Sequence, residues 1–214
     1  MLTNQRILFL GAHPDDLEFA AGGILSRLAK NVTCQIQIAI FSDCNEALPK
    51  GFPKDTLISE FQNSMAHLGI PKSKLIQKFF PVREFSSHRQ SILQDLIDIK
   101  SEFSPTMVFS PSKDDIHQDH STLGMEALRA FKQITLFDYT HPWNSIENSQ
   151  NTFFPISKSE LSNKIHLIKM YKSQENRSYS SENSISGVAS FYGSQSGFEF
   201  AEAFRCLHLA IMND

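Results

Sequence analysis

The chain has 214 residues, of which 41% are hydrophobic and 20% are charged, as is usual for a soluble globular protein. Its formal net charge is −3 and it contains no long run of lysine or arginine, which argues against a nucleic-acid partner or an anionic membrane surface. The first apolar run, residues 7–10, is too short for a signal sequence or a membrane span. We therefore expect a cytoplasmic protein with no membrane span.

The size and the cysteines predict a simple organisation. A chain of this length fits one domain, and we expect residues 1–214 to form it, since no interdomain linker is visible. The three cysteines, Cys34, Cys44 and Cys206, are odd in number and lack paired spacing, which favours reduced thiols over a disulfide framework. For the oligomeric state, the sequence leaves two alternatives open, a monomer and a homo-oligomer.

Apolar patterns in the first two thirds of the chain predict alternating strands and helices. Short apolar runs predict strands at 7–10, 33–41, 75–80, 106–110 and 134–137. Helical spacing of apolar residues predicts helices at 17–30, 56–68, 88–103 and 121–131. This alternation predicts an α/β fold of the Rossmann-like, doubly wound type, with a mainly parallel sheet and helices on both faces.

The last third of the chain is less regular. Residues 157–171 are predicted to form a helix. Residues 172–197 are rich in serine, glycine and asparagine, and predict loops around a short apolar piece at 185–192. Apolar periodicity returns at 198–211.

Polar residues that could carry chemistry follow three of the predicted strands. Residues 13–16 follow the first strand, Asp43 follows the second, and residues 117–120 follow the strand that ends near Ser110. In open parallel sheets, ligands bind outside the carboxyl ends of the strands. We therefore expect these segments to meet on one rim of the sheet, although about a hundred residues separate the two histidine-containing clusters.

The two clusters supply the parts of a metal-dependent hydrolase. Together they offer two imidazoles and a carboxylate for a metal, a spare carboxylate for proton transfer and a spare imidazole. A divalent ion held in this way makes hydroxide available near neutral pH. The alternative is structural: Asp15 and Asp16 could simply begin a helix, and His117 and His120 could be surface residues at another helix start.

In combination, the segments Ala12-His13-Pro14-Asp15-Asp16 and His117-Gln118-Asp119-His120 resemble the PIG-L/LmbE-like deacetylases. These are zinc-dependent hydrolases that remove acetyl from N-acetylglucosamine-type groups. The resemblance extends over most of the chain and includes Glu60 with Leu68-Gly69, Tyr171-Lys172-Ser173-Gln174 and Ala201-Glu202-Ala203-Phe204.

The resemblance implies His13, Asp16 and His120 as metal ligands, a set that suits Zn²⁺ but could also hold Fe²⁺, Co²⁺ or Mn²⁺. It implies Asp15 as the general base and His117 as the group that stabilises the oxyanion or protonates the leaving amine; whether His117 or Asp15 is the final acid stays open. Asp119 is expected to orient one of the histidines, and Asp114 or Asp115 could do the same.

Three residues on rim loops are candidate substrate contacts: Asp43, Arg83 and Trp143. Arg83 could bind a phosphate or carboxylate, or be an ordinary surface arginine. Trp143, the only tryptophan, could stack on a sugar face or pack in the core.

The chain departs from the family pattern in segments that leave the metal cluster intact. Ser42-Asp43-Cys44 replaces a common Thr-x-Gly segment, Leu57 stands where an arginine often precedes the glutamate, and an arginine-rich stretch is here Ala189-Ser190-Phe191-Tyr192-Gly193. No GxGxxG follows the first strand, which disfavours a dinucleotide-binding protein.

We expect a zinc-dependent N-deacetylase acting on an N-acetylated amino sugar or a small-molecule conjugate of one. The alternatives are an amidohydrolase for a non-sugar acyl conjugate and a non-catalytic metal- or ligand-binding protein.

Overall fold

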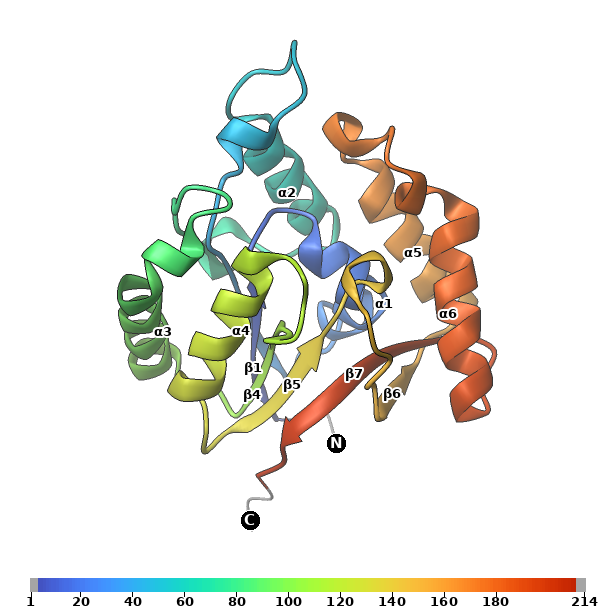
Figure 1. Cartoon of the computed structure of the whole chain (residues 1–214). Coiled ribbons are helices and arrows are strands. Elements are labelled where there is room, and N and C mark those ends of the chain that lie inside the picture. The colour runs from blue at the N-terminus through green and yellow to red at the C-terminus, as the bar shows by residue number, and fades with distance from the viewer. Residues whose placement is uncertain (1–3, 211–214) are drawn as a thin grey trace.

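A computed structural model describes residues 4–210, in which seven strands form one sheet (Figure 1). In chain order they are β1 (Arg6–Gly11), β2 (Gln35–Ile40), β3 (Leu75–Gln77), β4 (Met107–Pro111), β5 (Thr135–Tyr139), β6 (Thr152–Pro155) and β7 (Ala201–His208). Their order across the sheet is β3-β2-β1-β4-β5-β7-β6. The first five strands are parallel, whereas β7 is antiparallel to both β5 and β6. The predicted doubly wound, mainly parallel sheet is confirmed.

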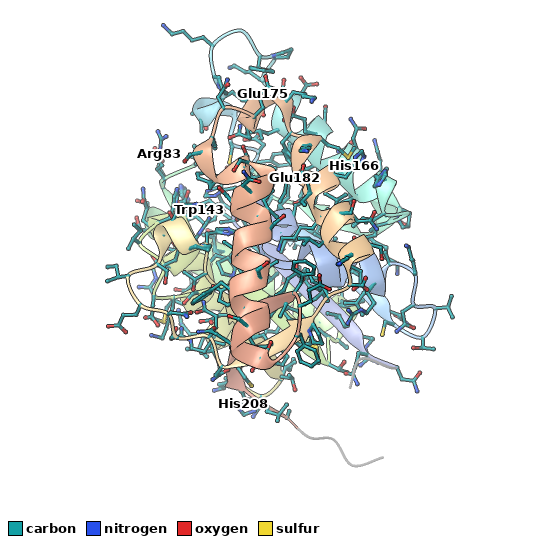
Figure 2. The ribbon with its side chains drawn as sticks, turned by 90° about the vertical axis from the view of Figure 1, so that its right-hand side faces the viewer. Arg83, Trp143, His166, Glu175, Glu182 and His208 are labelled. Atoms are coloured by element: carbon teal, nitrogen blue, oxygen red, sulfur yellow. The ribbon has the colours of Figure 1, made fainter. Side chains whose placement is uncertain are left out.

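Helices cover both faces of the sheet. They are α1 (Asp16–Leu28), α2 (Thr56–His67), α3 (Arg89–Phe103), α4 (Gln118–Ala130), α5 (Lys158–Lys169) and α6 (Glu182–Ser196). Figure 1 shows α3 and α4 on one side of the sheet and α1, α5 and α6 on the other. Figure 2 turns the molecule so that α6 runs across the side facing the viewer. Within residues 4–210, no helix combines the length and apolarity needed to cross a membrane.

Strand β1 shows how the sequence fills both cores. Its alternate side chains point to opposite faces, so Ile7 and Phe9 pack with α1, α2 and α5, while Leu8 and Leu10 pack with α3 and α4. All four are fully buried. A side chain of this size contributes about 1.5–3 kcal/mol when fully buried. The strand is apolar throughout because both of its faces are covered.

Helix α1, which follows the loop after β1, is built in two pieces. Ala21 has non-helical backbone angles (φ −136°, ψ 15°) in its middle. The carboxylate of Glu202, on β7, accepts hydrogen bonds from the backbone N–H groups of Gly23 and Ile24, both at 2.8 Å. Lys164 donates to the same carboxylate at 2.7 Å. Glu202 therefore caps the second piece of α1 from the other end of the chain.

In the last third of the chain, one sequence prediction was wrong and one strand was missed. Residues 182–196 form helix α6, not loops, because Ser181 accepts the N–H of Ser184 at 3.2 Å and Gly197 ends the helix in the left-handed region (φ 77°). These end signals fix a helix whose serine-rich composition predicted loops, and Ile185 and Ala189 supply its buried face. Strand β6 was not predicted; it is a four-residue edge strand paired only with β7.

The start of α4 also differs from the prediction. The helix begins at Gln118, not near residue 121, because the ring of His117 accepts the backbone N–H of Asp119 and so caps the helix. As a result, Asp119 and His120 lie in the first helical turn. In the described part of the chain, no disulfide joins any of the three cysteines.

Candidate metal centre

The histidine and aspartate clusters meet at the carboxyl ends of β1, β4 and β5, as the rim argument predicts. Residues 13–15 form the loop from β1 to α1, and residues 112–117 form the loop from β4 to α4. Strands β1 and β4 are neighbours, and the chain leaves them toward opposite sides of the sheet. This is the switch point at which doubly wound folds bind their ligands.

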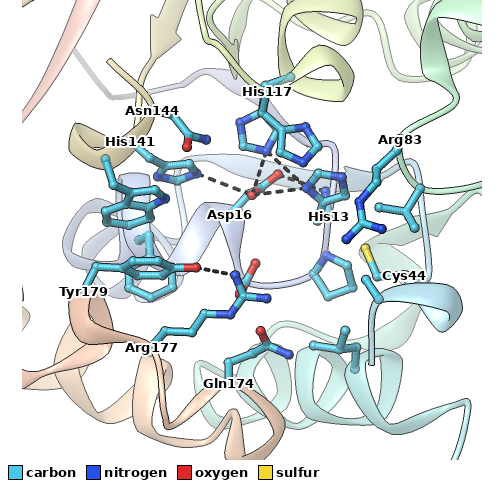
Figure 3. A pocket seen from close by; sticks show the side chains of 18 residues that line it. His13, Asp16, Cys44, Arg83, His117, His141, Asn144, Gln174, Arg177 and Tyr179 are labelled. Carbon is cyan, nitrogen blue, oxygen red and sulfur yellow. Dashed lines mark hydrogen bonds and ion pairs between the residues drawn. The ribbon is translucent and has the colours of Figure 1, made fainter. Parts of the chain in front are cut away.

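Three side-chain atoms converge at this point: Nδ1 of His13, Oδ1 of Asp16 and Nε2 of His120. Figure 3 shows the first two of these side chains facing each other. The His120 atom lies 3.1 Å from the His13 atom and 3.2 Å from the Asp16 atom, and the remaining pair is 3.9 Å apart. Bonds of about 2.0–2.2 Å to a tetrahedral zinc ion would place ligand atoms about 3.3–3.6 Å apart. These three donors therefore fit a small divalent cation.

The atoms of these side chains that face away from the convergence point have partners of their own. Nε2 of His13 lies 2.9 Å from Asp119, and Nδ1 of His120 lies 2.9 Å from Asp115. The second oxygen of Asp16 accepts the backbone N–H of His13 at 2.9 Å. Carboxylate–histidine pairs of this kind orient metal-binding imidazoles and fix their tautomers.

The electrostatics of the cluster favour positive charge at its centre. Burial opposes a charge on His120, but the carboxylates of Asp16 and Asp115 outweigh it and raise its pKa to about 10. Burial likewise opposes ionisation of Asp16, yet the facing imidazoles, His120 foremost, hold its pKa well below the usual range. A buried anion that attracts a proton to its neighbour attracts a metal cation in the same place.

Asp15 lies beside this cluster but outside it. Its backbone is in the left-handed region (φ 93°), and its side chain makes no capping hydrogen bond at the start of α1. Burial, followed by the charges of Asp16 and Glu18, raises the pKa of Asp15 well above its usual range. A helix-starting role does not account for this carboxylate, which lines the pocket instead.

His117 also lines the pocket, with its ring 4.8 Å from those of His13 and His120. Because its Nδ1 accepts the N–H of Asp119 at 3.2 Å, the ring proton is on Nε2. Burial and the neighbouring charges of His13 and His120 lower the pKa of His117 to about 4. His117 is therefore a neutral imidazole whose Nε2–H can act as a hydrogen-bond donor.

His141, just after β5, belongs to the cluster although sequence analysis did not identify it. It is 3% exposed, and its Nε2 lies 3.4 Å from Oδ1 of Asp16 without a hydrogen-bond partner in the described part of the chain. Two further groups of side chains could hold a metal, namely Asp16, His120 and His141, and His13, His117 and His120. Applying the rim argument to the strand at 134–137 would have found His141.

The three candidate substrate contacts have different surroundings. Arg83 is exposed and lines a cavity of about 360 Å³ that also contains His13, Asp16 and His120. Trp143 lines the same cavity. Trp143 is stacked between His141 (4.9 Å) and Tyr179 (3.9 Å), so both faces of the indole are occupied. Asp43 does not line the cavity, and its carboxylate instead accepts the side-chain amide of Asn45 at 2.6 Å.

A family model described as PIG-L, GlcNAc-PI de-N-acetylase, matches residues 8–131, more than half of the chain. The chain belongs to the PIG-L family. This confirms the resemblance drawn from the sequence motifs. Among proteins of curated function, none matches the sequence significantly.

Solved structures share the whole fold at low identity. The conserved protein TT1542 from Thermus thermophilus is 20% identical with a TM-score of 0.78, covering 98% of this chain and 97% of that one. N,N′-diacetylchitobiose deacetylase from Pyrococcus horikoshii is 19% identical with a TM-score of 0.78, covering 95% and 84%. GalB, the 4-carboxy-2-hydroxymuconate hydratase from Pseudomonas putida, is 18% identical with a TM-score of 0.76, covering 98% and 99%. A fold shared by deacetylases and a hydratase does not fix the reaction, so the site must carry the argument.

The residues that line the pocket fall into two groups, one within and one beyond the segment that matches the PIG-L family model. The matched segment contains the three metal-binding candidates together with Asp15 and His117. Much of the remaining wall comes from residues beyond position 131, namely His141, Trp143, Asn144, Gln174, Arg177 and Tyr179. The last three lie in the segment between α5 and α6. Sequence analysis quoted Gln174 only as part of the family resemblance and did not identify Arg177 or Tyr179.

Proposed function

We propose that the protein is a zinc-dependent N-deacetylase that releases acetate from an N-acetylated amino sugar or a conjugate of one. The observation that carries this proposal is the convergence of His13, Asp16 and His120 beside the Asp15 carboxylate, which makes no capping hydrogen bond to α1 and lines the same pocket. A binding protein would need the three donors but not the neighbouring carboxylate. Membership of a de-N-acetylase family supports the same reaction.

Asp15 and His117 have different roles in the proposed amide hydrolysis. A bound divalent ion would polarise the acetyl carbonyl and lower the pKa of a water molecule. Asp15 accepts a proton from the attacking water. His117 donates its Nε2–H to the carbonyl oxygen, where negative charge develops. Asp15 then returns its proton to the leaving amine, because His117, neutral with Nδ1 engaged, has no second proton to give.

Asp119 and Asp115 support this chemistry without touching the substrate. Each accepts a hydrogen bond from one metal-binding imidazole and leaves the other nitrogen of that ring facing the convergence point. The nitrogen and oxygen donors suit Zn²⁺ best, while Fe²⁺, Co²⁺ and Mn²⁺ accept the same ligands.

The test is amine release from a panel of N-acetylhexosamines, free and as nucleotide, lipid and thiol conjugates. Zinc-loaded protein is compared with the same preparation after chelation, and with chelated protein to which zinc has been restored. We expect release from at least one compound, lost on chelation and recovered with zinc. No release across the panel by zinc-loaded protein would contradict the proposal. Non-sugar N-acetyl amides are assayed beside the panel, and release from these alone would indicate an amidohydrolase for a non-sugar acyl conjugate.

A further inference from the structure

Two arginines reach the pocket from different parts of the fold. Arg83 comes from the loop between β3 and α3, and Arg177 from the segment between α5 and α6. Both line the cavity above the metal cluster. Figure 3 shows their guanidinium groups pointing into the cavity, Arg83 from the right and Arg177 from below. The two cations therefore face a common space.

Within the described residues, neither arginine forms an ion pair with a carboxylate, although the positive charge of Arg177 lowers the pKa of Asp15 against the larger effect of burial. Elsewhere, four arginines form ion pairs with acidic side chains: Arg27, Arg89, Arg129 and Arg205. Arg177 donates instead to the hydroxyl of Tyr179, a neutral group. Within the described residues, the Arg83 guanidinium makes no hydrogen bond or ion pair, and only the backbone of Arg83 is bonded. The hydrogen-bonding capacity of both cations is thus largely unused by the protein.

Arg83 is nevertheless held in a defined position. Its backbone has φ 70°, a left-handed conformation that costs energy in a residue other than glycine. The backbone N–H of Arg83 donates to Oδ2 of Asp119 at 2.7 Å, and that carboxylate is fully buried. The same oxygen lies 2.9 Å from Nε2 of His13. The contact that orients a metal-binding histidine therefore also fixes the loop that presents Arg83.

We propose that Arg83 and Arg177 form an anion-binding site, and that the group conjugated to the amino sugar carries a carboxylate or a phosphate. The inference rests on the proposed function for the identity of the sugar. A guanidinium presents its donors as a planar fork that matches the oxygens of either anion. The two guanidinium groups would recognise the conjugated group, while His13, Asp16, His120 and Asp15, which line the same cavity, act on the acetamide.

The experiment measures binding, so that it does not depend on turnover. Methyl glucosaminide, carboxymethyl glucosaminide and glucosamine 1-phosphate share the amine product but differ in charge. Calorimetric dissociation constants are measured for each with zinc-loaded wild type, Arg83→Ala, Arg177→Ala and Lys132→Ala. Lys132 is exposed in the loop before β5, at the opposite end of the sheet, so this control removes one positive charge away from the pocket. Arg83→Gln is added in case alanine disturbs the loop, with the thermal midpoint and zinc content checked for every variant.

We expect at least one of the two anionic ligands to bind wild type about tenfold or more tightly than the neutral one. This preference should fall by a similar factor in Arg83→Ala, Arg83→Gln and Arg177→Ala, and persist in Lys132→Ala. The better of the two anionic ligands identifies the anion as carboxylate or phosphate. Equal binding of all three ligands would overturn the inference, as would a preference that persists in the arginine variants.

The outcome is separable from that of the proposed function. If zinc-loaded protein releases acetate from N-acetylhexosamines but shows no preference for anionic ligands, the deacetylase stands and the anion site is wrong. If the preference depends on both arginines but no N-acetyl compound is hydrolysed, the anion site stands and the proposed reaction is wrong.

Discussion

Asp119 and His13 lie 106 positions apart in sequence, yet Oδ2 of Asp119 is 2.9 Å from Nε2 of His13. The Asp119 carboxylate also accepts the backbone N–H groups of Arg83 and Phe85, at 2.7 and 3.3 Å. One buried anion thus joins the loop after β1 that carries His13, the loop before α3 and the start of α4.

Substituting Asp119 should weaken metal binding without removing a ligand. Asp119→Asn keeps the shape of the side chain but loses the charge that orients His13, and residues in this position typically contribute ten- to hundredfold to metal affinity. We expect the zinc dissociation constant, measured by competition with a chromophoric chelator, to rise by about that factor. Asp98→Asn, at an exposed position on α3, is the control. Unchanged affinity in Asp119→Asn would show that His13 is oriented by other contacts.

Asp15→Asn should separate catalysis from metal binding. Asp15 contributes no atom to the three-donor cluster, so zinc content should match that of wild type. Loss of the general base should lower kcat by about 10²–10⁴-fold. The rate is measured by amine release from whichever N-acetyl conjugate proves to be a substrate, with zinc content measured on the same sample. Near-normal turnover would exclude Asp15 as the base.

Gly124 lets α4 approach the loop after β4. A Cβ added there would lie 2.4 Å from the carbonyl oxygen of Pro111 and 2.6 Å from the backbone nitrogen of Lys113. Gly124→Ala should therefore push α4, which carries His120, away from this loop. We expect a loss of about 1–3 kcal/mol in the free energy of unfolding, with weaker zinc binding.

Gly187 provides the matched control for Gly124→Ala. It lies in α6 with open space around the added atom. Gly187→Ala should stabilise the protein by about 0.5–1 kcal/mol, because alanine loses less backbone entropy in a helix. Urea unfolding of both variants tests the pair, and equal effects would contradict the packing argument.

The ion pair between Arg27 and Glu160 should make the stability of the folded protein depend on pH in the acid range. Both oxygens of Glu160 accept hydrogen bonds from Arg27 at 2.8 Å, which lowers the pKa of Glu160 from 4.5 to about 2. Because the pKa is lower in the folded state, the stabilisation is complete above pH 4.5 and disappears as the pH falls toward 2.

Glu160→Gln removes this ionisation and tests its contribution. At neutral pH, we expect wild type to have a larger free energy of unfolding than the variant. Between pH 4.5 and about 2, the free energy of unfolding of wild type should fall more steeply, so this difference should shrink. Urea unfolding at a series of pH values measures both slopes. Parallel curves would show that Glu160 titrates alike in the folded and unfolded chains.

The sequence predicted the parts of this protein that depend on short-range pattern. Short apolar runs located the five parallel strands, and the rim argument brought His13 and His120 together. Sequence analysis missed His141, Arg177 and Tyr179 because each enters the pocket from a segment without a recognisable motif. Helix α6 was missed for a related reason: its composition favours loops, and only its ends and its packing against β6 and β7 make it helical.

The cap that Glu202 provides for α1 has a consequence for how the protein is made. The ribosome synthesises Gly23 and Ile24 long before Glu202, so the two N–H groups in the middle of α1 wait for a partner until almost the whole described chain has been produced. These two hydrogen bonds to α1, the helix that follows the loop carrying His13, form only once β7 has been added to the sheet. The segment that carries His13 and Asp16 therefore reaches its final packing late, after nearly all of the described chain has been synthesised.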